Sequence, residues 1–88
     1  MKAETKKDVT TRLRSIEGHL KAVARMVEEE QYCVDVMRQT LAIEKALERV
    51  DALILESHLE TCVAEQFREG DPARTIRELS EIFNTSRR

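Results

Sequence analysis

The sequence predicts an all-α protein, a three-helix protomer with a long central helix. The 88-residue chain contains only two glycines and one proline, and helix formers dominate it while strand signals are absent. Its apolar residues recur at spacings of three and four, the period of one helix face. A chain of this length forms one domain, residues 1–88, with a core too small to be comfortable alone. Because two cysteines provide no disulfide framework, we expect oligomerisation to bury the remaining apolar surface.

The first helix is expected before a break near residues 30–32. Its apolar residues form one continuous seam: Val9, Leu13, Ile16, Leu20, Val23 and Val27. Asp8 or Thr10 can cap its start. Gly18 lies mid-helix at a cost of roughly 1 kcal/mol relative to Ala, so we expect another group to pack close to the backbone there. The Glu28–Glu30 run is a poor helix end because negative charge opposes the macrodipole, and one uninterrupted helix remains the alternative.

The second helix is expected from about residue 33 to 67. Its apolar surface covers well over a third of the circumference, which places it at the centre of a bundle. The residues concerned are Val36, Thr40, Ile43, Leu47, Val50 and Ile54, broadened by Leu41, Leu53, Leu55, Leu59 and Val63. Gly70 is expected to end this helix as its C′ residue. Asp71 as N-cap and Pro72 at the first helical position begin a third helix, whose apolar stripe is Ile76, Leu79, Ile82 and Phe83.

Cys33, His58 and Cys62 are three of the four Cys and His residues in the chain. His58 and Cys62 are four residues apart and share one face of a helix. Cys33 lies 25 residues before His58 with no Gly or Pro between them, which on one helix is ~37 Å. If the three share a metal, they come from two antiparallel copies that cross near Ala46 and Leu47. Such a site makes an obligate dimer with two equivalent metal positions.

Two thiolates and one imidazole are a soft ligand set that favours Cu(I) and also suits Zn(II). Structural zinc usually takes four protein ligands, and nothing in the spacing of His19 connects it to the other three. The alternative is that the cysteines are small buried apolar residues and His58 a hydrogen-bonded core histidine. An enzyme that uses Cys33 with His58 is disfavoured, because the chain has no glycine-rich turn to form an oxyanion hole.

The charge distribution is uneven, although the net charge is −2. Residues 1–25 carry seven Lys/Arg against three Asp/Glu, whereas residues 26–70 carry four against eleven. An oligomer that aligns its basic N-terminal segments can present a positive face; alternatively, Lys2, Lys6 and Lys7 form a solubilising tail. The N-terminus has no apolar leader, and no stretch approaches ~18 uncharged apolar residues. We therefore expect a cytoplasmic protein with no membrane partner.

Three segments of the chain resemble the CsoR/RcnR family of bacterial metal- and thiol-responsive repressors. They are R-L-R-S-I-E-G-H-L (12–20), R-M-V-E-E-E-Q-Y-C-V-D-V-M-R-Q (25–39) and H-L-E-T-C (58–62), and the similarity runs from about residue 9 to about residue 83. The resemblance implies an antiparallel four-helix-bundle dimer and a dimer of dimers, a homotetramer. Copper sensors of the family resemble this chain in having Cys, His and Cys as ligands. Nickel and cobalt sensors add an N-terminal His and replace the thiol at Cys62; formaldehyde sensors lack that thiol and persulfide sensors generally lack the His.

The resemblance also implies roles for residues that do not touch the metal. Tyr32 and Glu78 match the positions that surround the ligand His in copper sensors, where they would orient the imidazole. DNA binding would use basic residues of the first helices, best matched by Arg12 and Arg14 and more weakly by Lys21. Glu44-Lys45 departs from the basic pattern of relatives.

The function implied is a Cu(I)-responsive transcriptional repressor. The metal-free tetramer would bind operator DNA, and Cu(I) at the intersubunit Cys2His site would weaken that binding and derepress copper-efflux genes. One alternative is a thiol- or persulfide-sensing repressor in which Cys33 and Cys62 of opposite protomers become linked. The other is a copper-binding helical protein with no role at DNA.

Overall fold

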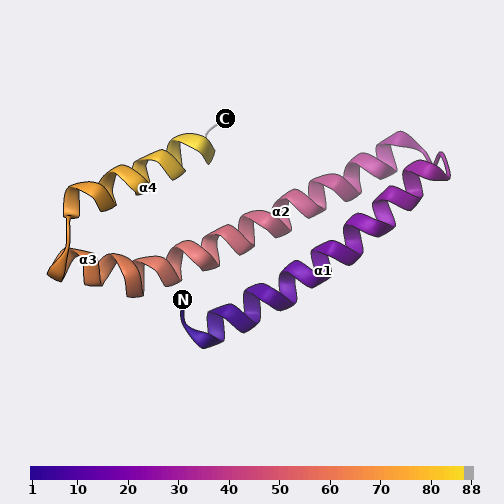
Figure 1. Ribbon diagram of the computed structural model, residues 1–88. Helices are drawn as coiled ribbons and strands as arrows, with labels where there is room; N and C mark the ends of the chain where they lie inside the picture. The colour runs from indigo at the N-terminus through magenta and orange to yellow at the C-terminus, as the bar shows by residue number, and fades with distance from the viewer. Residues whose placement is uncertain (87–88) are drawn as a thin grey trace.

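The computed structural model describes residues 1–86, apart from the side chains of Cys62, Val63, Ala64, Glu69 and Ser86. Its regular structure is entirely helical, which confirms the predicted all-α class. The elements are α1 (Ala3–Glu28), α2 (Cys33–His58), the π-helical turn η1 (Leu59–Val63), α3 (Ala64–Glu69) and α4 (Pro72–Ser86) (Figure 1). Because η1 and α3 continue α2 directly, the described chain has three helical arms. It measures 55 × 29 × 14 Å.

Helices α1 and α2 form an antiparallel hairpin with a narrow apolar core (Figure 1). Each core residue is at most 7% exposed, and together they are Val9, Ile16, Val23, Ile43 and Val50. The three from α1 recur every seven residues, so they are only alternate members of the predicted seam. The other members of that seam, Leu13, Leu20 and Val27, are 40%, 52% and 59% exposed. The apolar stripe of α1 therefore has two parts: one is packed against α2 and the other is open to solvent.

The first turn of α1 differs from its predicted start. The helix begins at Ala3 after Lys2, with no side-chain cap, so capping by Asp8 or Thr10 was wrong. Asp8 accepts a hydrogen bond from Arg12 Nε at 2.9 Å, and the Thr10 hydroxyl donates to a backbone carbonyl one turn earlier. The expected close contact at Gly18 is also absent from the described protomer, since a Cβ there would meet nothing within 4 Å.

The α1–α2 connection confirms the predicted break near residues 30–32. The backbone N–H of Glu30 donates to the Val27 carbonyl and that of Gln31 to the Met26 carbonyl, both at 3.0 Å. These are the paired bonds of a Schellman motif, which requires a left-handed residue at its centre. Glu30 occupies that position with φ of 55°. The negative run thus ends the helix through backbone geometry, despite its unfavourable charge.

The second helix continues to residue 69, but not as one α-helix. It passes through η1 after His58, so the expectation of uniform α-helix from 33 to 67 was wrong at this turn. Gly70 follows the last residue of α3 with no positive φ. Its absent side chain has another reason: a Cβ would lie 3.1 Å from the Gln66 carbonyl oxygen.

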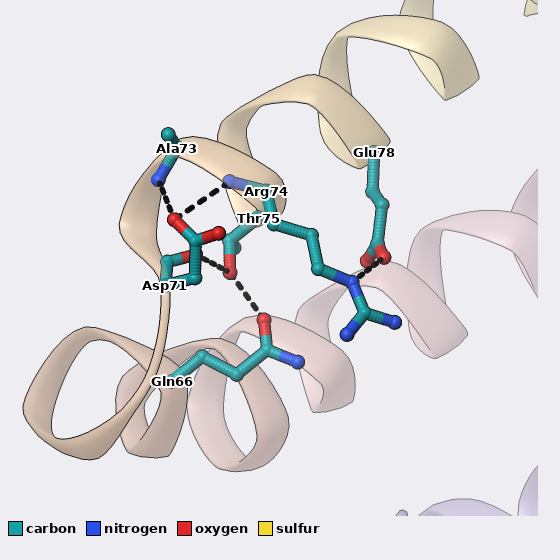
Figure 2. Close-up of polar contacts among 6 residues, drawn as sticks. All are labelled: Gln66, Asp71, Ala73, Arg74, Thr75 and Glu78. Atoms are coloured by element: carbon teal, nitrogen blue, oxygen red, sulfur yellow. Dashed lines mark hydrogen bonds and ion pairs between the residues drawn. The ribbon is translucent and has the colours of Figure 1, made fainter.

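The start of α4 is as predicted, with Pro72 as its first residue. The Asp71 carboxylate accepts from the backbone N–H groups of Ala73 and Arg74 at 3.1 and 3.3 Å (Figure 2). The apolar stripe of α4 is mostly uncovered, because Ile76, Ile82 and Phe83 are each more than half exposed. Figure 1 shows α4 separated from α2, on the side away from α1. No helix in residues 1–86 has the length and apolar character needed to cross a membrane.

Candidate metal centre

His58 is the last residue of α2 and is partly buried. With Met1, Ile54, Ser57 and Ile82 it lines a pocket of about 320 Å³. It also borders a larger, mainly apolar groove of about 570 Å³ between α2 and α4. The imidazole therefore lies at a junction of three segments, the N-terminus, the end of α2 and α4.

Cys62 lies four residues after His58, inside η1. Its side chain falls outside the described part of the structure. Single π-helical turns within α-helices are rare and occur frequently at functional sites. Both an α-turn and the slightly longer π-turn bring the chain back to about the same side after four residues, so the backbone position of Cys62 is compatible with a site shared with His58.

Cys33 lies at the opposite end of the same helix. It is the first residue of α2 and is exposed, with a free thiol. Since His58 is the last of the 26 residues of α2, the two are ~37 Å apart at 1.5 Å per residue. Among the described side chains, no three His, Cys, Asp or Glu residues gather closely enough to hold a metal ion. The premise that one unbroken helix separates Cys33 from His58 is confirmed, so a shared metal requires a second chain.

The donor chemistry of these residues fits a soft monovalent ion. The exposed Cys33 thiol is open to another molecule, whereas the His58 imidazole has apolar neighbours in Ile54 and Ile82. Thiolate and imidazole donors suit Cu(I) and also Zn(II), and the apolar neighbours of His58 keep water away from the imidazole. His19 does not belong to this region, because its Nε2 lies 2.7 Å from Gln39 Oε1 midway along the hairpin.

The two residues expected around the ligand His occupy different places. Tyr32 directly precedes α2, at the end that carries Cys33, and is 67% exposed. Glu78 lies on α4, partly buried, and its Oε1 accepts from Arg74 Nε at 3.0 Å (Figure 2). Arg74 was not among the residues predicted for this site, although its i, i+4 spacing to Glu78 is a standard signal for such a pair.

The position of Glu78 on α4 relates it to the His58 pocket. It lies three residues after Thr75 and four before Ile82, so the three share one face of α4. Thr75 is 1% exposed, and its hydroxyl donates to the side-chain oxygen of Gln66 on α3 (Figure 2). Ile82 lines the pocket of His58. Glu78 is therefore one helical turn from a wall of that pocket.

A second set of contacts joins the start of α1 to the same region. The backbone N–H of Lys2 donates to Ser57 Oγ at 3.3 Å, and the Lys2 ammonium pairs with the Glu60 carboxylate. The hydrogen bond and the negative charge of Glu60 raise the pKa of Lys2. Ser57, which directly precedes His58, is 3% exposed. Partners more than 50 residues apart leave no local pattern, so the sequence analysis had no signal for these contacts.

The predicted DNA-contacting residues separate into two environments on α1. Arg12 is partly buried and bonded to Asp8. Arg14 and Lys21 are exposed and lie seven residues apart, which places them on one face of the helix.

Comparison with known proteins gives consistent results. The family model described as metal-sensitive transcriptional repressor matches residues 5–85. The copper-sensing transcriptional repressor CsoR of Bacillus subtilis is 39% identical over 81 residues, which are 92% of this chain and 80% of that protein.

Two solved structures share the fold. The crystal structure of the copper-sensing repressor CsoR with Cu(I) from Geobacillus thermodenitrificans has a TM-score of 0.91 and 35% identity, covering 100% of this chain and 92% of that one. The nickel-responsive transcriptional regulator InrS has a TM-score of 0.73 and 35% identity, covering 90% of this chain and 89% of its own. The same architecture thus occurs in regulators named for different metals.

Proposed function

Because the chain belongs to the family of metal-sensitive transcriptional repressors, we propose that it is a Cu(I)-responsive repressor. It binds operator DNA in the metal-free state, in the cytoplasm, and releases it when Cu(I) occupies a site shared by two chains. It acts by binding and not as an enzyme. The observation that carries this proposal is the placement of Cys33 and His58 at opposite ends of one continuous α-helix.

The metal ligands are Cys33 of one protomer with His58 and Cys62 of its partner. An antiparallel pairing of two α2 helices brings these ends together twice, giving a homodimer with two equivalent sites. The open apolar residues of the hairpin support such an assembly, since Leu13, Leu20 and Leu47 are each at least 40% exposed in the protomer. Two such dimers form the homotetramer.

Signalling runs through residues near the imidazole. Tyr32, which comes with Cys33 from one protomer, and Glu78 of the protomer that supplies His58 accept or relay a hydrogen bond from the ring nitrogen of His58 that does not face the metal, which fixes the ring's orientation. The bond between Glu78 and Arg74 lies within α4, whereas a bond from Glu78 to His58 would attach α4 to the end of α2. Linkage makes this coupling reciprocal, so DNA weakens copper binding by the same factor, typically ~1–3 kcal/mol. Arg12, Arg14 and Lys21 provide phosphate contacts.

An anaerobic titration tests this function. Reduced protein is titrated with Cu(I), and separately with Zn(II), while its affinity for duplex DNA from upstream of its own gene is measured. We expect one Cu(I) per chain and a copper-specific fall in DNA affinity. Copper binding that leaves DNA affinity unchanged would indicate a copper-binding protein without a role at DNA. Release of DNA by oxidation or persulfide, but not by copper, would indicate a thiol sensor.

Mixing two variants tests the shared site. Chains with Cys33→Ala lack one ligand and chains with Cys62→Ala lack another, so each alone should bind copper weakly. A mixed dimer regains one intact site, because each chain supplies the thiol that the other lacks. The matched control is a mixture of Cys33→Ala with Cys33→Ala/Cys62→Ala chains, in which no intact site is possible. Equal copper affinity in the two mixtures would contradict a site between subunits.

A further inference from the structure

Gly18 is a residue without a role inside the protomer. It lies in the middle of the 26-residue helix α1, where glycine costs roughly 1 kcal/mol relative to alanine. A Cβ at this position would meet nothing within 4 Å, and no positive φ requires a glycine. Neither packing nor backbone geometry within the chain therefore explains it.

The face of α1 that carries Gly18 is basic. Gly18 is nine residues after Val9, about two and a half turns, and so lies opposite the packed core. Four cations share this face at helical spacing: Lys7, Arg14, Lys21 and Arg25. All four are exposed, and none forms an ion pair with any other described residue. We call Lys7, Arg14, Gly18, Lys21 and Arg25 the outer stripe; it is ~27 Å long at 1.5 Å per residue.

The surface beside this stripe is hollowed at its N-terminal end. A shallow groove of about 380 Å³ is lined by Ala3, Lys6, Lys7, Thr10, Thr11 and Arg14. Both threonine hydroxyls already donate to backbone carbonyls of α1. The free donors of the groove are therefore its cations, a combination that favours a strongly anionic ligand. Arg12 differs, because it must give up its ion pair with Asp8 before it can contact a phosphate.

We propose that the outer stripe receives the phosphate backbone of DNA and that Gly18 is the point of closest approach. The inference rests on the proposed function and assigns the binding surface within it. With no side chain at Gly18, phosphate oxygens can reach the helix surface and contact Arg14 and Lys21, one turn to either side, at the same time. A larger side chain would hold the backbone away and weaken both contacts, since most protein–DNA affinity comes from such phosphate contacts.

Gly18→Ala and Gly18→Leu test the close approach. Because alanine and leucine are better helix formers, both variants should unfold at higher denaturant concentration than the wild type. Their affinity for operator DNA should nevertheless fall, by about 3-fold for alanine and about 10-fold or more for leucine at constant salt. The control is Ser80→Leu, which adds the same side chain at an exposed position of α4, away from the outer stripe, and should leave DNA affinity close to wild type. Copper stoichiometry and oligomeric mass are measured on every variant.

The cations are tested by salt dependence. Lys7→Ala and Arg25→Ala, which the sequence analysis did not select, should each reduce the slope of log affinity against log salt by about one unit. Arg68→Ala removes the same charge from exposed α3 and should leave that slope unchanged. Unaltered slopes in both stripe variants would overturn the proposal.

The outcome for Gly18 also has a competing explanation. A leucine variant with normal DNA affinity but altered oligomeric mass would mean that the glycine admits another copy of this chain, and the inference would be wrong. The same variants are measured on random-sequence duplex at low salt, which requires the basic surface but neither an operator nor a copper response. Loss of that binding in Gly18→Leu supports the outer stripe even where the copper response fails, so the two proposals are separable. Wild-type protein that binds neither operator DNA nor random-sequence duplex would contradict both the outer stripe and the proposed function.

Discussion

The α1–α2 hairpin and α4 are held in place by different forces. The hairpin has an apolar core of residues from both helices, none more than 7% exposed. Helix α4 exposes more than half of Ile76, Ile82 and Phe83, and polar contacts hold it at its base, through Asp71, Thr75 and Gln66. The two helices of the hairpin are therefore held together by apolar contacts within one chain. The position of α4 therefore depends on a few hydrogen bonds, as the response to metal that we propose for this helix requires.

The largest expected effect is on the hairpin core. Ile43→Ala removes a side chain that is 4% exposed and should lower the free energy of unfolding by about 3 kcal/mol. Phe83→Ala, at 52% exposure, should cost clearly less in the metal-free protein despite its larger side chain. Urea denaturation at one fixed protein concentration measures both. Equal losses would mean that α4 is as firmly packed as the hairpin.

Next is the link between α4 and the metal. The Glu78→Ala protein should still bind copper, with a loss of affinity no larger than the ~10–100-fold that removing a residue next to a metal ligand can cause. It should lose most of the coupling of copper to DNA, about 2 kcal/mol, measured as the ratio of DNA affinities with and without saturating Cu(I). Arg74→Ala breaks the same ion pair but leaves the carboxylate, so its copper response should persist. A Glu78→Ala protein that fills with copper and still leaves DNA normally would contradict this role.

The base of α4 should show a smaller effect. Thr75→Val keeps the shape of a side chain that is 1% exposed but leaves the side-chain oxygen of Gln66 without its donor. We expect a loss of about 1.5 kcal/mol and faster hydrogen exchange confined to α3 and α4. Thr85→Val makes the same replacement at an exposed position of α4 and serves as the control. Faster exchange across the hairpin as well would show that the two regions are not independent.

A gain of stability is expected at the hairpin turn. Glu30→Gly relieves a left-handed residue with φ of 55° and removes a negative charge at the end of α1, which together should add about 1 kcal/mol. Thermal unfolding of the metal-free protein measures the change. A decrease would mean that the Glu30 side chain makes a stabilising contact that outweighs its backbone strain.

The smallest effect concerns the contact at the start of α1. Glu60→Gln should lower the pKa of Lys2 towards its ordinary value, because the carboxylate is what raises it. A lysine whose pKa is higher in the folded protein than in the unfolded chain stabilises the fold at pH values below its unfolded pKa. This contribution disappears as the pH rises through the pKa that Lys2 has in the folded protein. NMR titration of the Lys2 side chain checks the shift. An unchanged pKa would show that the pair does not persist in solution.

Local patterns in the sequence predict most of the fold and less of the site. The α4 cap at Asp71 follows from neighbouring residues and is confirmed. The break near residues 30–32 is also confirmed, although the negative charges there are unfavourable at a helix end and left one uninterrupted helix as an alternative. The start of α1 was placed too late because its contacts, from Lys2 to Ser57 and Glu60, join residues more than 50 positions apart. The seam of α1 was correct as a stripe, but spacing alone cannot tell which alternate members pack within the chain.

Residue type and spacing indicate the three candidate ligands, and the structure confirms that Cys33 and His58 lie at opposite ends of α2. Their joint use of a metal stays a prediction, since it depends on a second chain. The partner of Glu78 could have been found from its spacing to Arg74. The π-helical turn could not have been predicted from the sequence. A periodic apolar pattern assumes one number of residues per turn, so it does not show where that number changes locally.

That turn has a consequence for the angular phase of the chain. A turn closed by i→i+5 bonds holds one residue more than an α-turn, so the chain beyond η1 is about one residue, or roughly 100°, out of phase with a continuous α2. Gln66, which anchors Thr75, faces its present direction because of that extra residue. Deleting one residue from η1 would restore an even α-helix and rotate α3, and α4 with it, by about a quarter turn around the axis of α2. The direction in which α4 leaves the hairpin is thus set by a count of residues, and substitutions that preserve that count leave it unchanged.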